Sequence, residues 1–305
     1  MSPLVLTPGD PDGIGPEVTA QALIGLERPV VVVGDAAAFE RAARSAGLDC
    51  ARVDHWPATP AGVSLLDPGD QHEPVEVASI RAAVAACLEG KAGALVTGPI
   101  HKAKLARRGF HHPGHTDFLG ELCGVERPVM AFVGGSVRVA LVTVHLPLRA
   151  VPDALTTERV AHTVRTADGA LRSQLGLTAP RLAVCGLNPH AGDEGLLGRE
   201  EIDIIEPAVA GLRADGIDAR GPVSAETAFR WAVAGETDLV VAMYHDQGLA
   251  PLKALDFGRS VNWTLGLPIV RTSVDHGTAY DVAWTGAADP TSMRSALELA
   301  DRLTG

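Results

Sequence analysis

Short apolar runs alternate with alanine-rich, amphipathic segments along most of this chain of 305 residues. The apolar runs are rich in Val, Ile and Leu and predict strands at residues 4–6, 30–33, 94–97, 129–133, 137–145, 182–187, 239–244 and 260–265. The segments between them repeat apolar residues at helical spacing and predict helices at 15–26, 35–47, 76–89, 153–176, 199–215, 224–234 and 290–303. Strands that alternate with helices in this way predict an α/β fold with a mostly parallel sheet.

One segment departs from this alternation. Two strand patterns meet at Gly134, Gly135 and Ser136, which predicts a hairpin and therefore some antiparallel structure. Aromatic residues make up only 4% of the chain, so its core must consist mainly of Ala, Val, Leu and Ile. A chain of this length tends to divide its core, and we expect two lobes.

Composition limits the partners. The formal net charge is −11, and the absence of a Lys/Arg run argues against nucleic-acid binding. No apolar run is long enough for a membrane span, and no basic-then-apolar leader is visible at the start of the sequence. The four cysteines are widely spaced and form no CxxC pair, which favours reduced thiols. We expect a cytoplasmic protein without membrane contact.

Three histidines stand where an apolar strand pattern gives way to polar residues: His145, His190 and His245. In open α/β sheets, ligands gather beyond the carboxyl ends of strands, where these side chains would emerge. Three neutral imidazoles suit Zn²⁺ and similar divalent ions. Their spacing matches no short metal motif, so three separate histidines bonded to the backbone are an equally good interpretation of the residues alone.

A cationic group follows the third histidine. Lys253, Asn262 and Arg271 lie within twenty residues of one another, and Arg271 ends an apolar run in which an unpaired charge would be costly. A planar Arg fork, a Lys point charge and neutral donors together suit a phosphate. The alternative is a set of solvated surface charges, which fits Arg259 better than Arg271.

Two loops have features of nucleotide sites. TPGDPDGIGPE (residues 7–17) follows a strand and opens a helix, so it either presents N–H groups to an anion or is a turn that needs glycine. Neither GxGxxG nor GxxxxGK[ST] occurs, so the chain is not an ordinary Rossmann protein. In DHGTAYD (residues 275–281), Asp281 can accept hydrogen bonds from a ribose diol and would repel a 2′-phosphate.

Together these segments resemble the 4-hydroxythreonine-4-phosphate dehydrogenase family of vitamin B6 biosynthesis, nearly from end to end. The resemblance lies in TPGDPDGIGPE, TGPIHK (97–102), PGHTDFL (113–119), VTVHLPL (142–148), GLNPHAGDEGLLGREE (186–201), AMYHDQGLAPLK (242–253) and GLPIVRTSVDHGTA (266–279). Matches at several ordered places are specific to the superfamily, but they say less about the substrate.

The resemblance implies an isocitrate/isopropylmalate dehydrogenase-like architecture. Such proteins have two α/β lobes around a cleft, with mostly parallel sheets and some antiparallel strands, and form homodimers with active sites at the subunit interface. We accordingly expect residues 1–120 and 255–305 to form a first lobe with the NAD loop. Residues 121–254 would form a second lobe with the metal histidines and the dimer interface.

The resemblance also assigns roles to residues. It implies a metal site, contributed by both subunits, at His145, His190 and His245. It implies substrate contacts at His115, Thr116, Lys253, Asn262 and Arg271. DHGTAYD is similar to the adenosine-binding loop of isopropylmalate dehydrogenases, which implies NAD contacts at His276, Gly277 and Asp281.

The implied reaction is metal-dependent oxidation by NAD of the C3 hydroxyl of 4-phosphooxy-L-threonine, with loss of CO₂ to give 3-amino-2-oxopropyl phosphate, in pyridoxal 5′-phosphate biosynthesis. Zinc, magnesium or cobalt would serve as the Lewis acid. Asp246 and Lys102 are the candidate catalytic residues that relay the proton to water, and Lys102 is equally well interpreted as part of a structural ion pair.

Other functions stay open at this point. Within the superfamily, the substrate can instead be 4-phospho-D-threonate or 4-phospho-D-erythronate from sugar-acid catabolism, or an aromatic cis-dihydrodiol. The dihydrodiol has no phosphate and would leave the cationic group without a role. Outside dehydrogenases, the alternatives are a metal-dependent hydrolase or lyase acting on a phosphorylated substrate and a non-catalytic binding protein, neither of which needs the DHGTAYD loop.

Overall fold

A computed structural model of the chain describes residues 1–69, 72–112, 114–256 and 258–305. The chain divides into two compact units, residues 1–128 with 267–305 and residues 129–266. The two boundaries expected from the sequence, after residues 120 and 254, lie earlier in the chain than these. The difference has two physical reasons: Leu122, Cys123 and Val125 pack against the core of the first unit, and residues 261–265 pair with a strand of the second.

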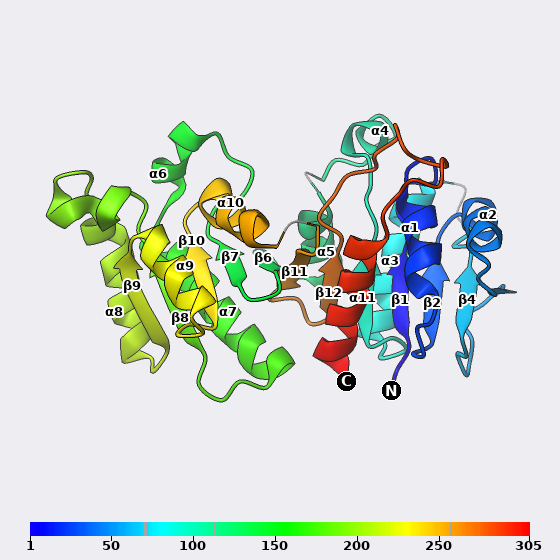
Figure 1. Ribbon diagram of the computed structural model, residues 1–305, viewed down its shortest axis with the longest axis horizontal. Coiled ribbons are helices and arrows are strands. Elements are labelled where there is room, and N and C mark those ends of the chain that lie inside the picture. The colour runs from blue at the N-terminus through cyan, green and yellow to red at the C-terminus, as the bar shows by residue number, and fades with distance from the viewer. Residues whose placement is uncertain (70–71, 113, 257) are drawn as a thin grey trace. The chain divides into compact units, whose positions relative to one another are not determined.

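The first unit contains the two ends of the chain (Figure 1). Its strands are β1 (Leu4–Thr7), β2 (Val30–Val33), β3 (Ala51–Val53), β4 (Val63–Leu66), β5 (Ala94–Thr97) and β12 (Val270–Ser273). Its helices are α1 (Gly15–Leu23), α2 (Ala36–Ala46), α3 (Val75–Leu88), α4 (Lys102–Ala106), α5 (His115–Cys123) and α11 (Thr291–Thr304).

The strands of the first unit are parallel and follow the order β3-β4-β2-β1-β5-β12. The chain leaves β1 toward β2 on one side and later returns to β5 on the other. In open α/β sheets, ligands bind outside the carboxyl ends of the strands near such a change of direction. The segments after β1, β5 and β12 are therefore the places to examine for ligand contacts.

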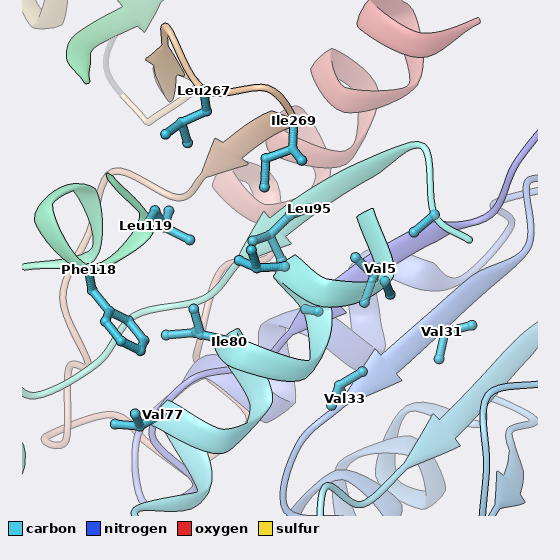
Figure 2. Packing of buried hydrophobic residues seen from close by; sticks show 14 of the residues in the cluster. Val5, Val31, Val33, Val77, Ile80, Leu95, Phe118, Leu119, Leu267 and Ile269 are labelled. Atoms are coloured by element: carbon cyan, nitrogen blue, oxygen red, sulfur yellow. The ribbon is translucent and has the colours of Figure 1, made fainter. Parts of the chain in front are cut away.

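The core of the first unit consists of aliphatic side chains with few aromatics (Figure 2). Val5 on β1, Val31 on β2 and Ile80 on α3 belong to this core, and all three are almost fully buried. The runs of consecutive apolar residues in β1 and β2 follow from this environment, because both faces of a parallel sheet are covered by helices.

The second unit has a mixed sheet. Its strands are β6 (Val129–Val133), β7 (Arg138–Leu141), β8 (Arg181–Cys185), β9 (Asp218–Val223), β10 (Leu239–Ala242) and β11 (Val261–Leu265). Its α-helices are α6 (Val151–Ala154), α7 (Thr157–Leu175), α8 (Glu206–Ala214), α9 (Ala225–Val233) and α10 (His245–Leu255). Short 3₁₀ segments η1 (Leu148–Ala150) and η2 (Pro189–Gly195) and a π-helical turn η3 (Glu201–Ile205) complete it.

The strand order in the second unit is β11-β6-β7-β10-β8-β9. β6 is antiparallel to both β7 and β11, whereas β7, β10, β8 and β9 are parallel. The predicted hairpin is confirmed, and Gly134 N–H donates to the carbonyl of Val137 at 2.9 Å where it turns. The predicted α/β class, mostly parallel with some antiparallel strands, is likewise confirmed.

Local signals explain several helix starts. Asp35 and Ser224 accept hydrogen bonds from the N–H groups of Ala38 and Thr227 and so cap α2 and α9. All four cysteines are free thiols. Across the described ranges, no helix combines the length and apolar character needed to cross a bilayer.

Candidate active site

The three predicted metal histidines follow three neighbouring strands of the second unit. β10 lies between β7 and β8 and is parallel to both, so their carboxyl ends meet at one edge of the sheet. His145 follows β7, His190 follows β8 and His245 follows β10. The strands end a few residues earlier than predicted, and His245 begins helix α10 instead of a loop. Despite these two differences, all three histidines follow the carboxyl ends of neighbouring parallel strands, where ligands bind in such sheets.

His145 and His245 lie close together. Their ring centroids are 5.8 Å apart. Nδ1 of His245 lies 2.7 Å from Oδ1 of Asp246, a contact that orients the ring and leaves Nε2 for a ligand. Metal-binding histidines commonly have a carboxylate on the other ring nitrogen, so the chemistry of this pair fits a divalent ion.

His190 stands in a strained segment. Residues 190–194 of η2 have φ values between 44° and 82°, in the left-handed region that favours glycine, although only Gly192 is a glycine. Non-glycine residues adopt this conformation only where the surrounding structure fixes them, and such positions cluster at functional sites. The His190 side chain is exposed.

A buried carboxylate, that of Glu201, holds the segment before His190. Glu201 is 1% exposed, and its Oε1 accepts hydrogen bonds from the N–H groups of Leu187 and Asn188 at 2.7 and 2.8 Å. The side-chain amide of Asn188 donates to Oε2 of Glu201 at 3.0 Å. Sequence reasoning missed this supporting role, although Glu201 ends the matching segment GLNPHAGDEGLLGREE.

The predicted ligands do not form one complete site within a single chain. Among the described residues, no group of three or more His, Cys, Asp or Glu side chains is placed to hold a metal ion. His145 and His245 supply a pair of imidazoles, and His190 does not join them. A catalytic zinc site commonly has about three protein ligands, of which this pair would supply two.

In the first unit, Arg271 provides a buried cation. It lies on β12, is 2% exposed, and its Nη2 donates to Oγ1 of Thr97 on the adjacent strand at 2.7 Å. Burial lowers the pKa of the Arg271 guanidinium to about 9, which leaves it protonated at neutral pH. A buried guanidinium fork is well suited to a phosphate or carboxylate.

His115 lies near the positive charges of Arg271 and Lys102 and is a neutral imidazole. Burial, together with the positive charges of Arg271 and Lys102, holds its pKa well below the usual 6.5. Its Nε2 atom is shielded from solvent and has no hydrogen-bond partner among the residues that the structure describes. A buried ring nitrogen without a partner is costly, and a substrate oxygen would provide the missing hydrogen bond.

The depressed pKa of His115 predicts a specific loss of stability in acid. Below pH ~6.5 the unfolded chain protonates this histidine and the folded chain does not, so unfolding is favoured by up to about 1.4 kcal/mol per pH unit until the folded pKa is reached. His115→Asn removes this contribution. The melting temperature of the variant should therefore fall less than that of wild type between pH 7 and pH 5. Parallel curves for the two proteins would contradict a neutral His115 in the folded protein.

The candidate catalytic residue Lys102 and the other predicted substrate residues are divided between the two units. Lys102 begins α4, and a Cβ added to Gly114 would lie 3.3 Å from its Cε and Nζ, so this glycine leaves room for the lysine. Thr116 follows His115 on α5 and is half-buried. Lys253 on α10 and Asn262 on β11 belong to the second unit and are also half-buried.

The predicted NAD loop is anchored to the turn after β1. The hydroxyl of Tyr280 donates to Oδ2 of the fully buried Asp10 at 2.6 Å. Nδ1 of His276 lies 2.9 Å from the carbonyl oxygen of Gly277. Asp281 is exposed, so its carboxylate is accessible to a ligand. The loop therefore has a fixed base and an accessible acidic group.

The glycine-rich segment after β1 is a close-packed turn. The N–H groups of Asp10, Asp12, Gly13 and Ile14 are already donated to protein oxygens. A Cβ added to Gly15 would lie 1.9 Å from the carbonyl oxygen of Pro8. Of the two interpretations of this segment, a turn that needs glycine explains these contacts, because the N–H groups required for an anion are in use.

An ion-pair network around Asp10 was not predicted from the sequence. Nζ of Lys104 lies 2.8 Å from Oδ1 of Asp10 and 2.7 Å from Oδ2 of Asp12. Burial raises the pKa of Asp10, but the hydrogen bonds from Lys104 and Tyr280 outweigh this effect and hold it below its usual value. The network joins the segments after β1, β5 and β12.

Comparison with known proteins shows to which family the chain belongs. The family model described as pyridoxal phosphate biosynthetic protein PdxA matches residues 26–300. The chain belongs to this family. The 4-hydroxythreonine-4-phosphate dehydrogenase of Stutzerimonas stutzeri is 44% identical over 99% of this chain and 98% of its own length. That of Geobacter metallireducens is 48% identical over 97% and 94%. As a PdxA-family member with such relatives, the chain is an oxidoreductase.

Solved structures agree with this assignment. The crystal structure of 4-hydroxythreonine-4-phosphate dehydrogenase from Klebsiella pneumoniae is 39% identical, covers 100% of both chains and has a TM-score of 0.89. A terephthalate 1,2-cis-dihydrodiol dehydrogenase from Burkholderia xenovorans is 29% identical over 99% of this chain and 98% of its own, with a TM-score of 0.71. A β-decarboxylating dehydrogenase from Thermococcus kodakarensis is 16% identical over 99% and 84%, with a TM-score of 0.50, which is a likeness of fold alone.

Proposed function

We propose that this PdxA-family member oxidises the C3 hydroxyl of 4-phosphooxy-L-threonine with NAD⁺ during pyridoxal 5′-phosphate biosynthesis. The observation that carries the proposal is the buried Arg271 beside the neutral His115, a combination suited to an anionic substrate group. The relatives named 4-hydroxythreonine-4-phosphate dehydrogenase support the choice of substrate.

In the proposed reaction, the C3 hydrogen leaves as hydride to the nicotinamide ring and the C3 hydroxyl loses its proton. The resulting β-keto acid loses its carboxyl group as CO₂ and gains a proton to give 3-amino-2-oxopropyl phosphate. Zinc, magnesium or cobalt, when bound, supplies a Lewis acid that lowers the pKa of the hydroxyl. Asp246 and Lys102 are the two candidates to relay the proton to water, and both are exposed.

The substrate contacts follow from charge and burial. Arg271 binds the phosphate or carboxylate as a fixed guanidinium fork, and the neutral His115 hydrogen-bonds a substrate oxygen. Lys253 and Asn262 add a point charge and a neutral donor, and Thr116 adds a hydroxyl. Together they would fix C3 in position for hydride transfer.

We further propose that the metal site is shared between two copies of the chain in a homodimer. His145 and His245, whose rings are 5.8 Å apart, would come from one copy and His190 from the other. This division accounts for the missing third ligand within the described part of one chain. It also gives the exposed His190 and its fixed segment a role at the subunit interface.

NAD would bind at the DHGTAYD loop through His276, Gly277 and Asp281. The exposed carboxylate of Asp281 can accept hydrogen bonds from the adenosine ribose, and its charge disfavours the 2′-phosphate of NADP. We retain a cytoplasmic location as part of the proposal, in line with four free thiols.

The test of this function is NADH formation by the purified protein before and after removal of metal. We expect absorbance at the NADH band to rise with 4-phosphooxy-L-threonine and NAD⁺, to stop after chelation, and to return on adding zinc, magnesium or cobalt. NADP⁺ should be reduced much more slowly. Turnover that persists in fully metal-free protein would contradict the metal-dependent mechanism.

A further inference from the structure

A pocket of about 470 Å³ lies in the first unit, and none of its described lining residues is assigned to the reaction. Its walls are formed by residues that follow β1, β2 and β4 and by the start of α3, and α4 completes it. These are carboxyl ends of parallel strands, where ligands bind in open α/β sheets. The carboxylates among its described lining residues are Asp12, Asp35, Asp67, Glu73 and Glu76.

Glu76 is the unusual member of this set. It is 2% exposed, and its Oε2 atom has no hydrogen-bond partner among the described residues. Burial raises its pKa. Because the last torsion of a glutamate is broad, either carboxylate oxygen can turn toward the pocket. A buried carboxylate oxygen without a donor is costly, and a donor supplied by a ligand would remove that cost.

The remaining carboxylates are already paired or solvated. Asp35 caps α2, Asp67 accepts from the N–H of Gly69 at 3.0 Å, and Glu73 pairs with Arg81. Asp12 is exposed and pairs with Lys104. They therefore set the sign of the local potential, while Glu76 is the acceptor that a ligand can satisfy.

The charge of the pocket walls indicates which class of ligand can bind. The five carboxylates face two cations, Lys104 and Arg108, so the walls favour a positive group and repel phosphates. A bare metal ion is a poor match, because the described residues contain no group of carboxylates and histidines placed to hold one. The pocket is also much larger than one ion and has room for a small organic molecule.

We propose that this pocket binds a small organic cation through a primary ammonium group, with Glu76 as its inner acceptor. An ammonium carries three donors and no acceptor, which complements a buried carboxylate within an acidic wall. The site uses none of the predicted metal, substrate or NAD residues, so the proposal does not depend on the proposed reaction.

The experiment is calorimetric titration of the full-length protein with 1,4-diaminobutane, without substrate or NAD⁺. We expect wild type to bind the diamine, and Glu76→Gln to weaken binding about tenfold or more, because a charge-assisted hydrogen bond is lost without a change in side-chain shape. The matched control is Glu89→Gln, which removes a half-exposed carboxylate just beyond the other end of α3 and outside the pocket, and should bind as wild type does.

Two further measurements keep the result interpretable. Glu76→Gln should melt no lower than wild type, since it replaces a desolvated charge by a neutral amide. 1,4-Butanediol, which has the same length but no charge, should not bind. Absence of diamine binding to wild type, equal binding to Glu76→Gln, or equal binding of the diol would each overturn the proposal.

Discussion

Co-expression of His190→Ala and His245→Ala chains is expected to restore activity that neither variant has by itself. Each homodimer lacks a metal ligand at both sites, and its kcat/KM should fall at least about a thousandfold. In a heterodimer, one site combines the intact His245 of one chain with the intact His190 of the other. Heterodimers isolated with two different affinity tags should therefore have about half of the wild-type activity per dimer.

The matched control is a dimer of two differently tagged His190→Ala chains, which should stay inactive. Metal analysis adds a readout that is independent of turnover, since the heterodimer should hold about one ion where wild type holds two. If the heterodimer folds and assembles but shows neither metal nor activity, His190 and His245 do not come from different copies. That outcome would contradict the shared site.

Arg271→Lys is expected to lower kcat/KM for 4-phosphooxy-L-threonine about a hundredfold while leaving NADH affinity unchanged. Lysine keeps the charge but loses the planar fork that bonds Thr97 and can hold an oxyanion at two points. If the group that Arg271 binds is the phosphate, which does not react, the loss should appear mainly in KM. Steady-state kinetics and a separate NADH titration measure the two effects.

Arg259→Lys serves as the control for this prediction, because Arg259 is exposed and should tolerate the change. A second comparison uses 4-hydroxy-L-threonine, which lacks the phosphate. If Arg271 binds the phosphate, the variant and wild type should use this poor substrate equally slowly. Unchanged kcat/KM for the phosphorylated substrate would contradict a role for Arg271 in anion binding.

The sequence predicted the central strands better than the edges of the sheet. β2, β5 and β6 have the predicted limits because each is a continuous apolar run covered on both faces. β3 and β9 were missed because most of their residues are exposed or half-buried, so no apolar run marks them. β4 and β12 were also missed, because Ser64 and Arg271 interrupt their apolar runs.

Site residues were predictable where chemistry is concentrated at strand ends. His145, His190 and His245 follow adjacent strands as expected, because the alternation of strands and helices already predicts which edge they share. The interactions of Asp10 with Lys104 and Tyr280 were not predictable, because they join residues far apart in the chain through side-chain geometry alone. The same holds for Glu76, whose helix position gives no sign of its burial.

The most direct test of the central claim is the rate of NADH formation with three substrates offered separately to the metal-loaded protein. They are 4-phosphooxy-L-threonine, 4-phospho-D-threonate and 4-phospho-D-erythronate, which share a phosphate but differ in stereochemistry and in the amino group. The proposed function predicts a clear preference in kcat/KM for the L-threonine derivative. A preference for either D-acid, or no NADH from any of the three despite bound metal, would contradict it.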